Sequence, residues 1–566
     1  MLPLLQIQNL QVAFETEQGN HTALHDISLA VARREIVAVV GESGSGKSVT
    51  ALAVLQLLPA NTVRYTNGGI FFSEDGLQQT NLLLESGDRL RAIRGNKIAM
   101  IFQEPMTSLN PVFTCGHQVM EAICGHHKIS KAAAKKQTLD LFEKVRLPDP
   151  AAMFGRYPHQ LSGGQKQRVM IAMAMSGNPS VLICDEPTTA LDVTVQKQIL
   201  QLIKALQVTT GMGVIFITHD LGLVAEIADK VVVMYRGNIV ETGLVKQVMH
   251  HPLHPYTKGL LACRPVLHRK GERLPVVSDF LEGKADREAS IGPVAIPADD
   301  VRTNHQKLIE VQHLKVWYPG KKSFLGKVSG YTKAVDDVSF DVYTGETLGL
   351  VGESGCGKTT LGRTLLRLVE PTAGQLLFNG NDLLQYKPAD LRRLRKKIQI
   401  IFQDPYSALN PSITIGNAIQ EVLQVHQVLP SARQRKERVM ELLDKVKLLP
   451  EHYYRYPHEF SGGQRQRVVI ARALALNPSF IVCDESVSAL DVSVQAQVLN
   501  LLNDLKKEFR FTIIFISHDL SVVHYISDRI MVMQQGKIIE TGTAEQIYHH
   551  PKEPYTQGLI AAIPKA

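Results

Sequence analysis

Short apolar runs recur along the chain in two sets that follow the same order. The N-terminal residues alternate between apolar and polar positions, which predicts a strand, and residues 308–318 repeat this pattern. Six further runs are almost continuously apolar: residues 35–40, 181–185, 214–218, 347–351, 480–484 and 512–517. Continuous apolar runs of this length are typical of parallel strands that are buried on both faces.

Helical periodicity of apolar residues appears between these runs, again in matching pairs. Helices are predicted for residues 48–58, 131–145, 165–175, 359–369, 432–446 and 464–474. Alternating strands and helices predict an α/β fold in each half of the chain, with a parallel-sheet core and an added, mostly helical subdomain.

The two sets predict two folded domains joined by a linker. A chain of 566 residues is too long for one core, and several motifs recur 299 residues apart. We assign residues 1–264 to the first domain and residues 307–566 to the second. Residues 265–306 lack periodicity and contain four prolines, which is typical of a linker.

Composition indicates a soluble globular protein, with 44% hydrophobic and 20% charged residues and a net charge of +8. This charge is spread along the chain, whereas a nucleic-acid platform would concentrate it on one face. No apolar stretch reaches the roughly 18 residues of a membrane-spanning helix, and the N-terminus does not resemble a signal peptide. The six cysteines form no CxxC pair, and their spacing suits neither a zinc site nor a disulfide framework, so we expect a reducing, cytosolic compartment.

Each half contains a glycine-rich GxxxxGK[ST] loop between a predicted strand and a predicted helix. In such loops the backbone amides surround nucleotide phosphates, and the helix N-terminus favours anions. Lys47 and Lys358 are expected to reach the terminal phosphates, while Ser48 and Thr359 are expected to ligate Mg²⁺. The other loop residues that we assign to ATP are Gly41, Ser43, Gly44, Gly46, Gly352, Ser354, Gly355 and Gly357.

A pair of carboxylates ends one apolar strand in each half. Asp185 and Asp484 are predicted to hold Mg²⁺, and Glu186 and Glu485 to orient and deprotonate the attacking water. An acidic pair at a strand end is often only a solvated turn. Here it follows a phosphate loop in both halves, which favours the catalytic interpretation.

A Ser-Gly-Gly-Gln turn opens a predicted helix in each half and forms a second small cradle for an anion. One ATP needs only one such cradle, so the second predicts a phosphate that is gripped from two sides. The residues of these signature turns are Ser162, Gly163, Gly164, Gln165, Ser461, Gly462, Gly463 and Gln464.

The order of these motifs resembles the ATP-binding cassette (ABC) ATPase family over nearly the whole chain. The resemblance implies two tandem phosphate-loop domains, each with an antiparallel β subdomain beside the parallel core. It also implies that each ATP lies between one cassette's phosphate loop and the other's signature. By the same resemblance, Phe14 and Tyr318 stack on adenine, and Gln103 and Gln403 contact Mg²⁺ and couple to a partner. Asp192 and Asp491 bridge the two sites, and His219 and His518 assist catalysis.

Two departures between the copies spare the groups that would touch phosphate, metal or water. Phe460 replaces Leu161 before the signature, and Ser486 replaces Pro187 after the acidic pair. We therefore expect two hydrolytically competent sites.

Within this family the chain resembles the peptide and nickel importer group, and most closely the ATP-binding subunits of bacterial glutathione and oligopeptide importers. The resemblance rests on IFQEPMTSLNP (residues 101–111) and IFQDPYSALNP (residues 401–411), and on HPYTKGLL and EPYTQGLI near each domain's end. It implies ATP hydrolysis coupled to import, two membrane permeases, a solute-binding protein and a place at the cytoplasmic face of the inner membrane. Only Cys263 follows a PYT segment, so no iron–sulfur cluster is expected.

The alternative is a permease-free tandem cassette that acts on ribosomes or nucleic acid. Such a protein would favour a long, charged, helical segment between the cassettes. Residues 265–306 contain four prolines and mixed charge, which argues against this alternative.

Overall fold

The computed structural model describes residues 2–16, 19–103, 108–189, 191–283, 306–320 and 330–564. The chain divides into two compact units. The first contains Met1–Leu261 and Val277–Glu282, with the last three residues of the chain, and the second contains Ala262–Val276 and Gly283–Ile563. Part of the expected linker (residues 284–305) and part of the first IFQ segment (residues 104–107) lie outside the described residues.

The first unit is built around a six-stranded sheet in the order β10-β9-β3-β8-β7-β6. Every neighbouring pair is parallel except β9 and β10. The strands are β3 (Ile36–Val40), β6 (Ile98–Ile101), β7 (Val181–Asp185), β8 (Gly213–Thr218), β9 (Lys230–Tyr235) and β10 (Asn238–Leu244).

A second, antiparallel sheet has the order β2-β1-β4-β5. Its strands are β1 (Leu5–Thr16), β2 (Gly19–Val31), β4 (Val63–Phe72) and β5 (Thr80–Asn81). This sheet is the antiparallel β subdomain that the family resemblance implies.

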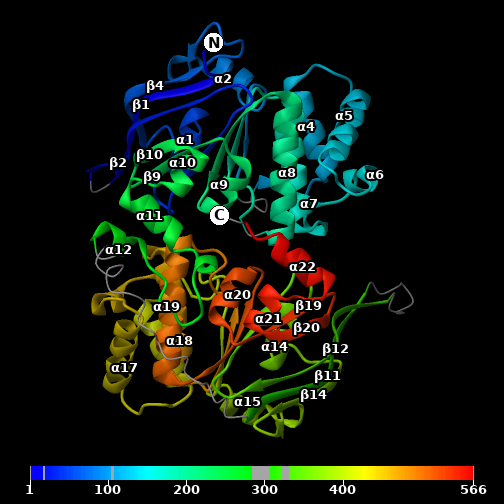
Figure 1. Cartoon of the computed structure of the whole chain (residues 1–566), viewed down its shortest axis with the longest axis vertical. Coiled ribbons are helices and arrows are strands. Elements are labelled where there is room, and N and C mark those ends of the chain that lie inside the picture. Colours follow the sequence, from blue (N-terminus) through cyan, green and yellow to red (C-terminus); the bar gives the residue numbers. More distant parts are fainter. Residues whose placement is uncertain are drawn as a thin grey trace. The chain divides into compact units, whose positions relative to one another are not determined.

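The helices of the first unit form the helical subdomain and cover the parallel sheet. In Figure 1, α4, α5 and α6 lie on the side of this unit away from β1 and β4. The helices are α1 (Lys47–Val54), α2 (Gly87–Ile93), α4 (Cys115–His126), α5 (Lys131–Lys144), α6 (Pro150–Phe154), α7 (Gly163–Ala174), α8 (Val193–Thr210), α9 (Leu221–Ile227), α10 (Val245–His250), α11 (Pro255–Ala262) and α12 (Val277–Leu281).

The parallel sheet is buried on both faces, as its apolar strands predict. In β7, Leu182 and Cys184 belong to the core shared with the helical subdomain. Ile183, which points to the opposite face, belongs to the core shared with the antiparallel sheet and α1. Cys184 and its counterpart Cys483 are fully buried and pack as small hydrophobic residues.

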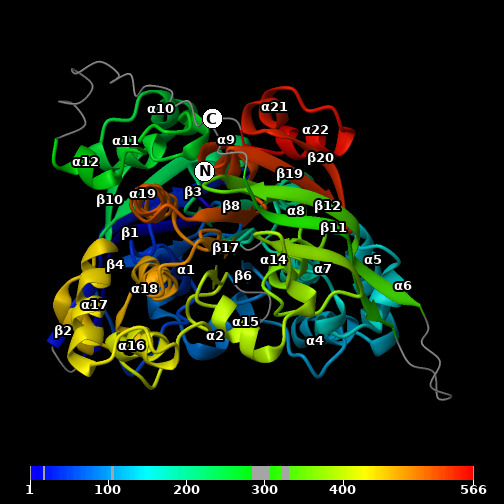
Figure 2. The same cartoon turned by 90° about the horizontal axis from the view of Figure 1, so that it is seen from below.

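The second unit repeats this architecture. Its sheets have the orders β16-β17-β18-β13-β19-β20 and β12-β11-β14-β15, and Figure 2 separates α16 and α17 from β11 and β12. The strands are β11 (Lys307–Pro319), β12 (Tyr331–Tyr343), β13 (Thr347–Val351), β14 (Ala373–Phe378), β15 (Asn381–Asp382), β16 (Ile398–Ile401), β17 (Phe480–Asp484), β18 (Thr512–Ser517), β19 (Arg529–Gln534) and β20 (Lys537–Thr543). The helices are α14 (Lys358–Leu365), α15 (Pro388–Leu394), α16 (Ile415–Val425), α17 (Ala432–Lys445), α18 (Gly462–Leu474), α19 (Val492–Phe509), α20 (Leu520–Ile526), α21 (Ala544–His549) and α22 (Pro554–Ala561).

Residues 262–276, most of which the sequence assigns to the linker, are folded into the second unit. The backbone of Leu274 forms two hydrogen bonds with the side chain of Asn500 in α19, at 3.0 and 2.8 Å. The hydroxyl of Tyr525 in α20 donates to the carbonyl of Glu272 at 2.7 Å. This part of the expected linker therefore has a fixed place on α19 and α20.

No helix within the described part of the chain is both long enough and apolar enough to cross a bilayer.

Candidate functional site: two phosphate loops and their carboxylates

The phosphate loops adopt backbone conformations that require glycine. Gly41 and Gly46 have φ angles of 155° and 102°, in or near the range that L side chains rarely adopt. A Cβ atom on Gly41 would lie 2.2 Å from the carbonyl oxygen of Met234. In the second unit, Gly352 and Gly357 have φ angles of 155° and 111°, so both loops form the same turn.

The loop lysines are buried and lie across their own loops. Lys47 is 5% exposed, and its Nζ donates to the carbonyl oxygens of Gly41 and Glu42, each at 2.8 Å. Lys358 makes the equivalent bonds to Gly352 and Glu353 at 2.7 and 2.9 Å. Each ammonium group is thus held at the mouth of a loop whose helix, α1 or α14, begins with that lysine.

The hydroxyl and the aspartate that were assigned to Mg²⁺ meet in both units. Ser48 Oγ donates to Asp185 at 3.0 Å, and Thr359 Oγ1 donates to Asp484 at 2.9 Å. Burial raises the pKa of Asp185 to about 6, and the neighbouring charge of Glu186 adds to the rise. Burial also raises the pKa of Asp484. Buried oxygen ligands of this kind fit a hard divalent cation, whose charge would offset the cost of burying the carboxylate.

Glu186 is held by a residue of its own turn and by residues of two other segments. Its carboxylate lies 3.2 Å from Gln103 Nε2, 2.9 Å from Thr189 Oγ1 and 3.3 Å from His219 Nδ1. Burial alone would raise the pKa of Glu186, but the hydrogen bond and charge of His219, the charge of Lys47 and the Thr189 hydroxyl together lower the pKa to about 2. Glu186 is therefore ionised across the physiological pH range.

Glu485 repeats this arrangement with one donor fewer among the described contacts. Gln403 Nε2 lies at 2.9 Å and His518 Nδ1 at 3.4 Å from its carboxylate, and His518 again helps to lower the pKa of the glutamate against the opposing effect of burial. Ser488, which corresponds to Thr189, donates instead to the backbone carbonyl of Glu485 at 3.0 Å.

Both glutamates hold a strained backbone conformation. Glu186 has a φ of 46° and Glu485 a φ of 48°, in the left-handed region that non-glycine residues rarely adopt. Each backbone amide donates to the neighbouring strand, to Ile217 or Ile516, at 3.0 Å. Strain of this kind is typical of functional sites, where the surrounding structure fixes one side-chain direction.

The signature turns are exposed helix N-termini. Ser162 caps α7 in a capping box with Gln165, and Ser461 caps α18 in the same way with Gln464. A Cβ atom on Gly164 would lie 2.5 Å from Val195, and one on Gly463 would lie 2.2 Å from Val494. The second glycine is therefore needed because α7 and α18 approach α8 and α19 closely.

The remaining predicted residues lie in the elements that the sequence indicated. Phe14 in β1 is half-buried against the antiparallel-sheet core, whereas Tyr318 in β11 is 43% exposed. Asp192 caps α8 by accepting from Val195 at 2.9 Å, and Asp491 occupies the same position before α19. No contact in the described residues assigns these four side chains to a ligand.

Sequence reasoning missed the tyrosine of each PYT segment. The hydroxyl of Tyr256 in α11 accepts a hydrogen bond from the Glu42 amide at 2.9 Å, and Tyr555 in α22 accepts one from Glu353 at 2.9 Å. The signal was present, since these tyrosines lie 299 residues apart, like the catalytic motifs. In the sequence these PYT segments supported only the resemblance to the importer group, and their tyrosines were not assigned to the phosphate loops.

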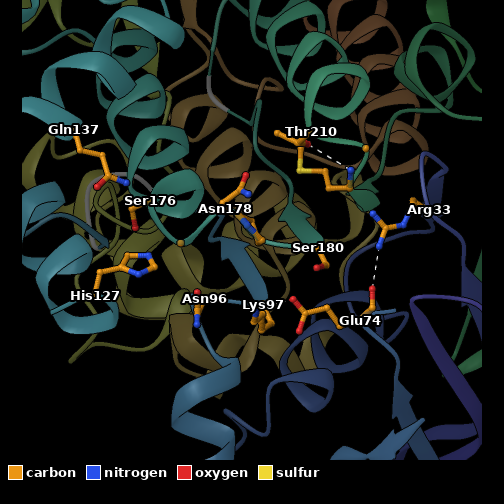
Figure 3. A pocket seen from close by; sticks show the side chains of 14 residues that line it. Arg33, Glu74, Asn96, Lys97, His127, Gln137, Ser176, Asn178, Ser180 and Thr210 are labelled. Atoms are coloured by element: carbon orange, nitrogen blue, oxygen red, sulfur yellow. Dashed lines mark hydrogen bonds and ion pairs between the residues drawn. The ribbon is translucent and has the colours of Figure 1, made fainter. Parts of the chain in front are cut away.

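A cavity of about 580 Å³ in the first unit is separate from these residues (Figure 3). Three of the residues that line it stand directly before parallel strands: Lys97 before β6, Ser180 before β7 and Met212 before β8. The cavity therefore lies at the amino end of the parallel sheet, whereas the phosphate loop follows the carboxyl end of β3. None of the residues predicted to bind ATP lines it.

Comparison with known proteins agrees with this geometry. A sequence model described as "ABC transporter" matches residues 24–189 and 335–488, which together make up more than half of the chain. The chain belongs to the ABC transporter family. A second model, described as "Oligopeptide/dipeptide transporter, C-terminal region", matches residues 240–283 and 539–566 of this ABC protein, the segments that contain Tyr256 and Tyr555.

Relatives that align over the whole chain are also found. The chain is 50% identical to the "Glutathione import ATP-binding protein GsiA" of Escherichia coli O6:H1 (strain CFT073) and to that of Shigella boydii serotype 4. Each alignment covers 100% of this chain and 90% of the relative. Among solved structures, the ATP-binding cassette MJ0796 bound to ADP and Pi matches 42% of this chain and 98% of its own, with 26% identity and a TM-score of 0.38.

Proposed function

We propose that this chain is the ATP-hydrolysing subunit of an ABC importer for a small peptide-like solute, with glutathione as the first candidate and di- or oligopeptides as the others. The observation that carries the proposal is the 50% identity to glutathione import ATP-binding proteins over the full chain. The oligopeptide-type C-terminal region at the end of both cassettes supports the same group.

ATP hydrolysis requires a site that binds phosphates and orients a water molecule. In our proposal the phosphate-loop amides and Lys47 bind the terminal phosphates, and Glu186 accepts a hydrogen bond from the attacking water. Gln103 and His219 hold the Glu186 carboxylate in place. Lys358, Glu485, Gln403 and His518 have the same roles in the second cassette.

Mg²⁺ would be held through Ser48 and Asp185 in one cassette and through Thr359 and Asp484 in the other, with Gln103 and Gln403 nearby. When bound, the cation neutralises charge on the transferred phosphoryl group. The buried aspartates support this proposal because their raised pKa values mark them as carboxylates without a sufficient counter-charge of their own.

We further propose that each signature serves the ATP bound by the other cassette's phosphate loop. Motif positions assign Ser461 and Gly463 to the ATP at Lys47, and Ser162 and Gly164 to the ATP at Lys358. Binding energy that exists only when both sides grip the phosphates favours a closed state. The catalytic groups are intact in both copies, so both sites should hydrolyse ATP.

Partners and location follow from the same proposal. Import ATPases act with permease subunits and a solute-binding protein, so we place the chain at the cytoplasmic face of the inner membrane, attached through two permeases. The test is to express the chain with candidate permeases, reconstitute the complex in proteoliposomes and measure ATP-dependent uptake with glutathione, dipeptides or metal chelates. Uptake of a peptide-like solute supports the proposal, whereas co-purification with ribosomes in place of permeases overturns it.

A further inference from the structure

Two histidines and a glutamate that belong to none of the ATP-binding motifs meet on the second cassette. Helices α20 and α21 pack side by side (Figure 1). His524 projects from α20, and Glu545 and His549 project from one face of α21, four residues apart. His524 Nε2 lies 3.2 Å from Glu545 Oε1, and His549 Nε2 lies 3.3 Å from Glu545 Oε2.

The spacing of these atoms matches a metal site. In a tetrahedral zinc site with bonds of about 2.0–2.2 Å, neighbouring ligand atoms lie roughly 3.3–3.5 Å apart. Each imidazole nitrogen lies close to this distance from one oxygen of Glu545, His524 from Oε1 and His549 from Oε2. With one ligand atom taken from each residue, all three lie within 4.8 Å of one another. Two imidazoles and a carboxylate form a ligand set that suits zinc and leaves a fourth position for water.

The surroundings hold the ligands in this arrangement. His524 is 9% exposed, and the ring of Tyr548 stacks on it with a centroid distance of 4.2 Å and an interplanar angle of 21°. Thr543 and Gln546 form a capping box that fixes the start of α21 just before and after Glu545. Glu545 and His549 are exposed, so an ion can enter from solvent.

The cluster is specific to the second cassette. The corresponding helices of the first cassette, α9 and α10, have Ala225 and Lys246 in place of His524 and Glu545, and only His250 is retained. The repeat therefore supplies the same backbone framework without the ligands. Lys246 would also repel a cation at this position.

We propose that His524, Glu545 and His549 form a zinc-binding site that joins α20 to α21 in the second cassette. Helix α20 begins directly after His518, with Asp519 as its N-cap. Bound zinc would therefore restrict the motion of α20, which follows His518, the histidine that contacts Glu485. The site makes the second cassette sensitive to a metal ion to which the first cassette does not respond.

The test is a titration of the full chain, with any affinity tag removed, with zinc chloride in competition with a chelator of known affinity. The wild type should bind one zinc ion through this site. His549→Ala and Glu545→Gln change exposed side chains, and each should weaken that binding at least about tenfold, because weaker perturbations of the surrounding shell already cost this much. His250→Ala in the first cassette is the matched control and should bind like the wild type.

Thermal unfolding gives a second readout. Zinc should raise the Tm of the wild type and of His250→Ala, because a ligand that binds the folded state stabilises it. The Tm of His549→Ala and Glu545→Gln should rise less at the same zinc concentration. Equal zinc affinity in the wild type and in both variants would overturn the proposal and leave the cluster as a surface ion pair. An equal loss in His250→Ala would also overturn it.

Discussion

The Tyr256 hydroxyl accepts a hydrogen bond from the backbone amide of Glu42 at 2.9 Å, which links the C-terminal PYT segment of the first cassette to its phosphate loop. The second cassette repeats this bond between Tyr555 and Glu353 at 2.9 Å. In the first cassette the ring of Tyr256 is fully buried and packs on Tyr235 at a centroid distance of 4.4 Å. A segment 214 residues further along the chain thus fixes one peptide unit of the loop.

Tyr256→Phe should therefore weaken ATP binding at the first phosphate loop. The variant keeps the ring but leaves the Glu42 amide without this acceptor, which costs about 1 kcal/mol and corresponds to roughly fivefold lower affinity. Titration with a fluorescent ATP analogue measures this effect. Tyr555→Phe should act in the same way at the second loop, and Tyr235→Phe is the control because it removes the neighbouring hydroxyl. Unchanged affinity in both Tyr256→Phe and Tyr555→Phe would show that the bond does not support the loop.

Glu186→Gln and Glu485→Gln should leave ATP binding intact and lower hydrolysis. Both glutamates are ionised and held by a glutamine and a histidine, so each can orient water as an anion, which the amide cannot. Loss of a general base typically costs about 10²- to 10⁴-fold in rate, so the double variant should release phosphate at least about 100-fold more slowly. Each single variant retains about half of the turnover if the sites work independently and far less if they are coupled. A double variant with full phosphate release would exclude both residues as bases.

Asp185→Asn should stabilise the ligand-free protein at alkaline pH while abolishing Mg²⁺-dependent ATP binding at the first site. Burial raises the pKa of Asp185 from 3.8 to about 6, so ionisation of this group opposes folding. The cost is full above pH 6 and disappears as the pH falls below the pKa of the unfolded chain. At one pKa unit per 1.36 kcal/mol, removing the charge should gain about 2–3 kcal/mol at pH 8.

Thermal unfolding of Asp185→Asn at pH 8 and at pH 4 measures this dependence. Asparagine keeps an acceptor oxygen for Ser48, so the 3.0 Å hydrogen bond can persist in the variant. The gain in Tm should be largest at pH 8 and mostly lost at pH 4. A variant that melts below the wild type at pH 8 would contradict the assignment of a strained buried charge.

Much of the fold was predictable because the apolar runs are continuous. Residues 181–185, 347–351, 480–484 and 512–517 are strands with the predicted bounds. The helices after the phosphate loops are shorter than predicted, since α1 ends at Val54 and not near residue 58. Gln56 adopts a left-handed conformation, and the Arg94 guanidinium satisfies the carbonyls of Leu55 and Gln56 at 2.7 and 2.9 Å. The sequence pattern could not reveal this tertiary contact.

The site was predictable to the extent that its residues stand in motifs. Ser48 and Asp185 were both assigned to Mg²⁺, and they meet because they follow strands whose carboxyl ends share one edge of a parallel sheet. The contact of Gln103 with Glu186 was not predicted, since the resemblance implied only that Gln103 contacts Mg²⁺ and couples to a partner. The additional donor Thr189 lies only three residues after Glu186, but its hydroxyl direction depends on the local turn. The second cassette shows this dependence, because the hydroxyl of Ser488, at the position of Thr189, donates to the backbone carbonyl of Glu485 and not to its carboxylate.

The fold of residues 262–276 gives a last prediction, since the sequence assigned residues 262–264 to the first domain and residues 265–276 to a linker. Asn500 is 4% exposed, and its side chain both donates to and accepts from the backbone of Leu274. Asn500→Ala leaves two buried backbone groups unpaired, which should cost about 2–4 kcal/mol and lower the Tm of the second unit by several degrees. The first cassette has the exposed Gln201 at the corresponding position of α8, so its Tm should not change.

Arg273→Ala is the matched control for Asn500→Ala. It removes an ion pair with Asp504 at 3.3 Å, in which the Arg273 side chain is 63% exposed. Exposed ion pairs contribute less than about 1 kcal/mol, so this variant should melt close to the wild type. Hydrogen exchange of the Leu274 amide supplies the local readout: exchange should accelerate in Asn500→Ala and remain slow in Arg273→Ala. If Asn500→Ala preserves both the Tm and the slow exchange, residues 262–276 do not contribute to the stability of the second unit.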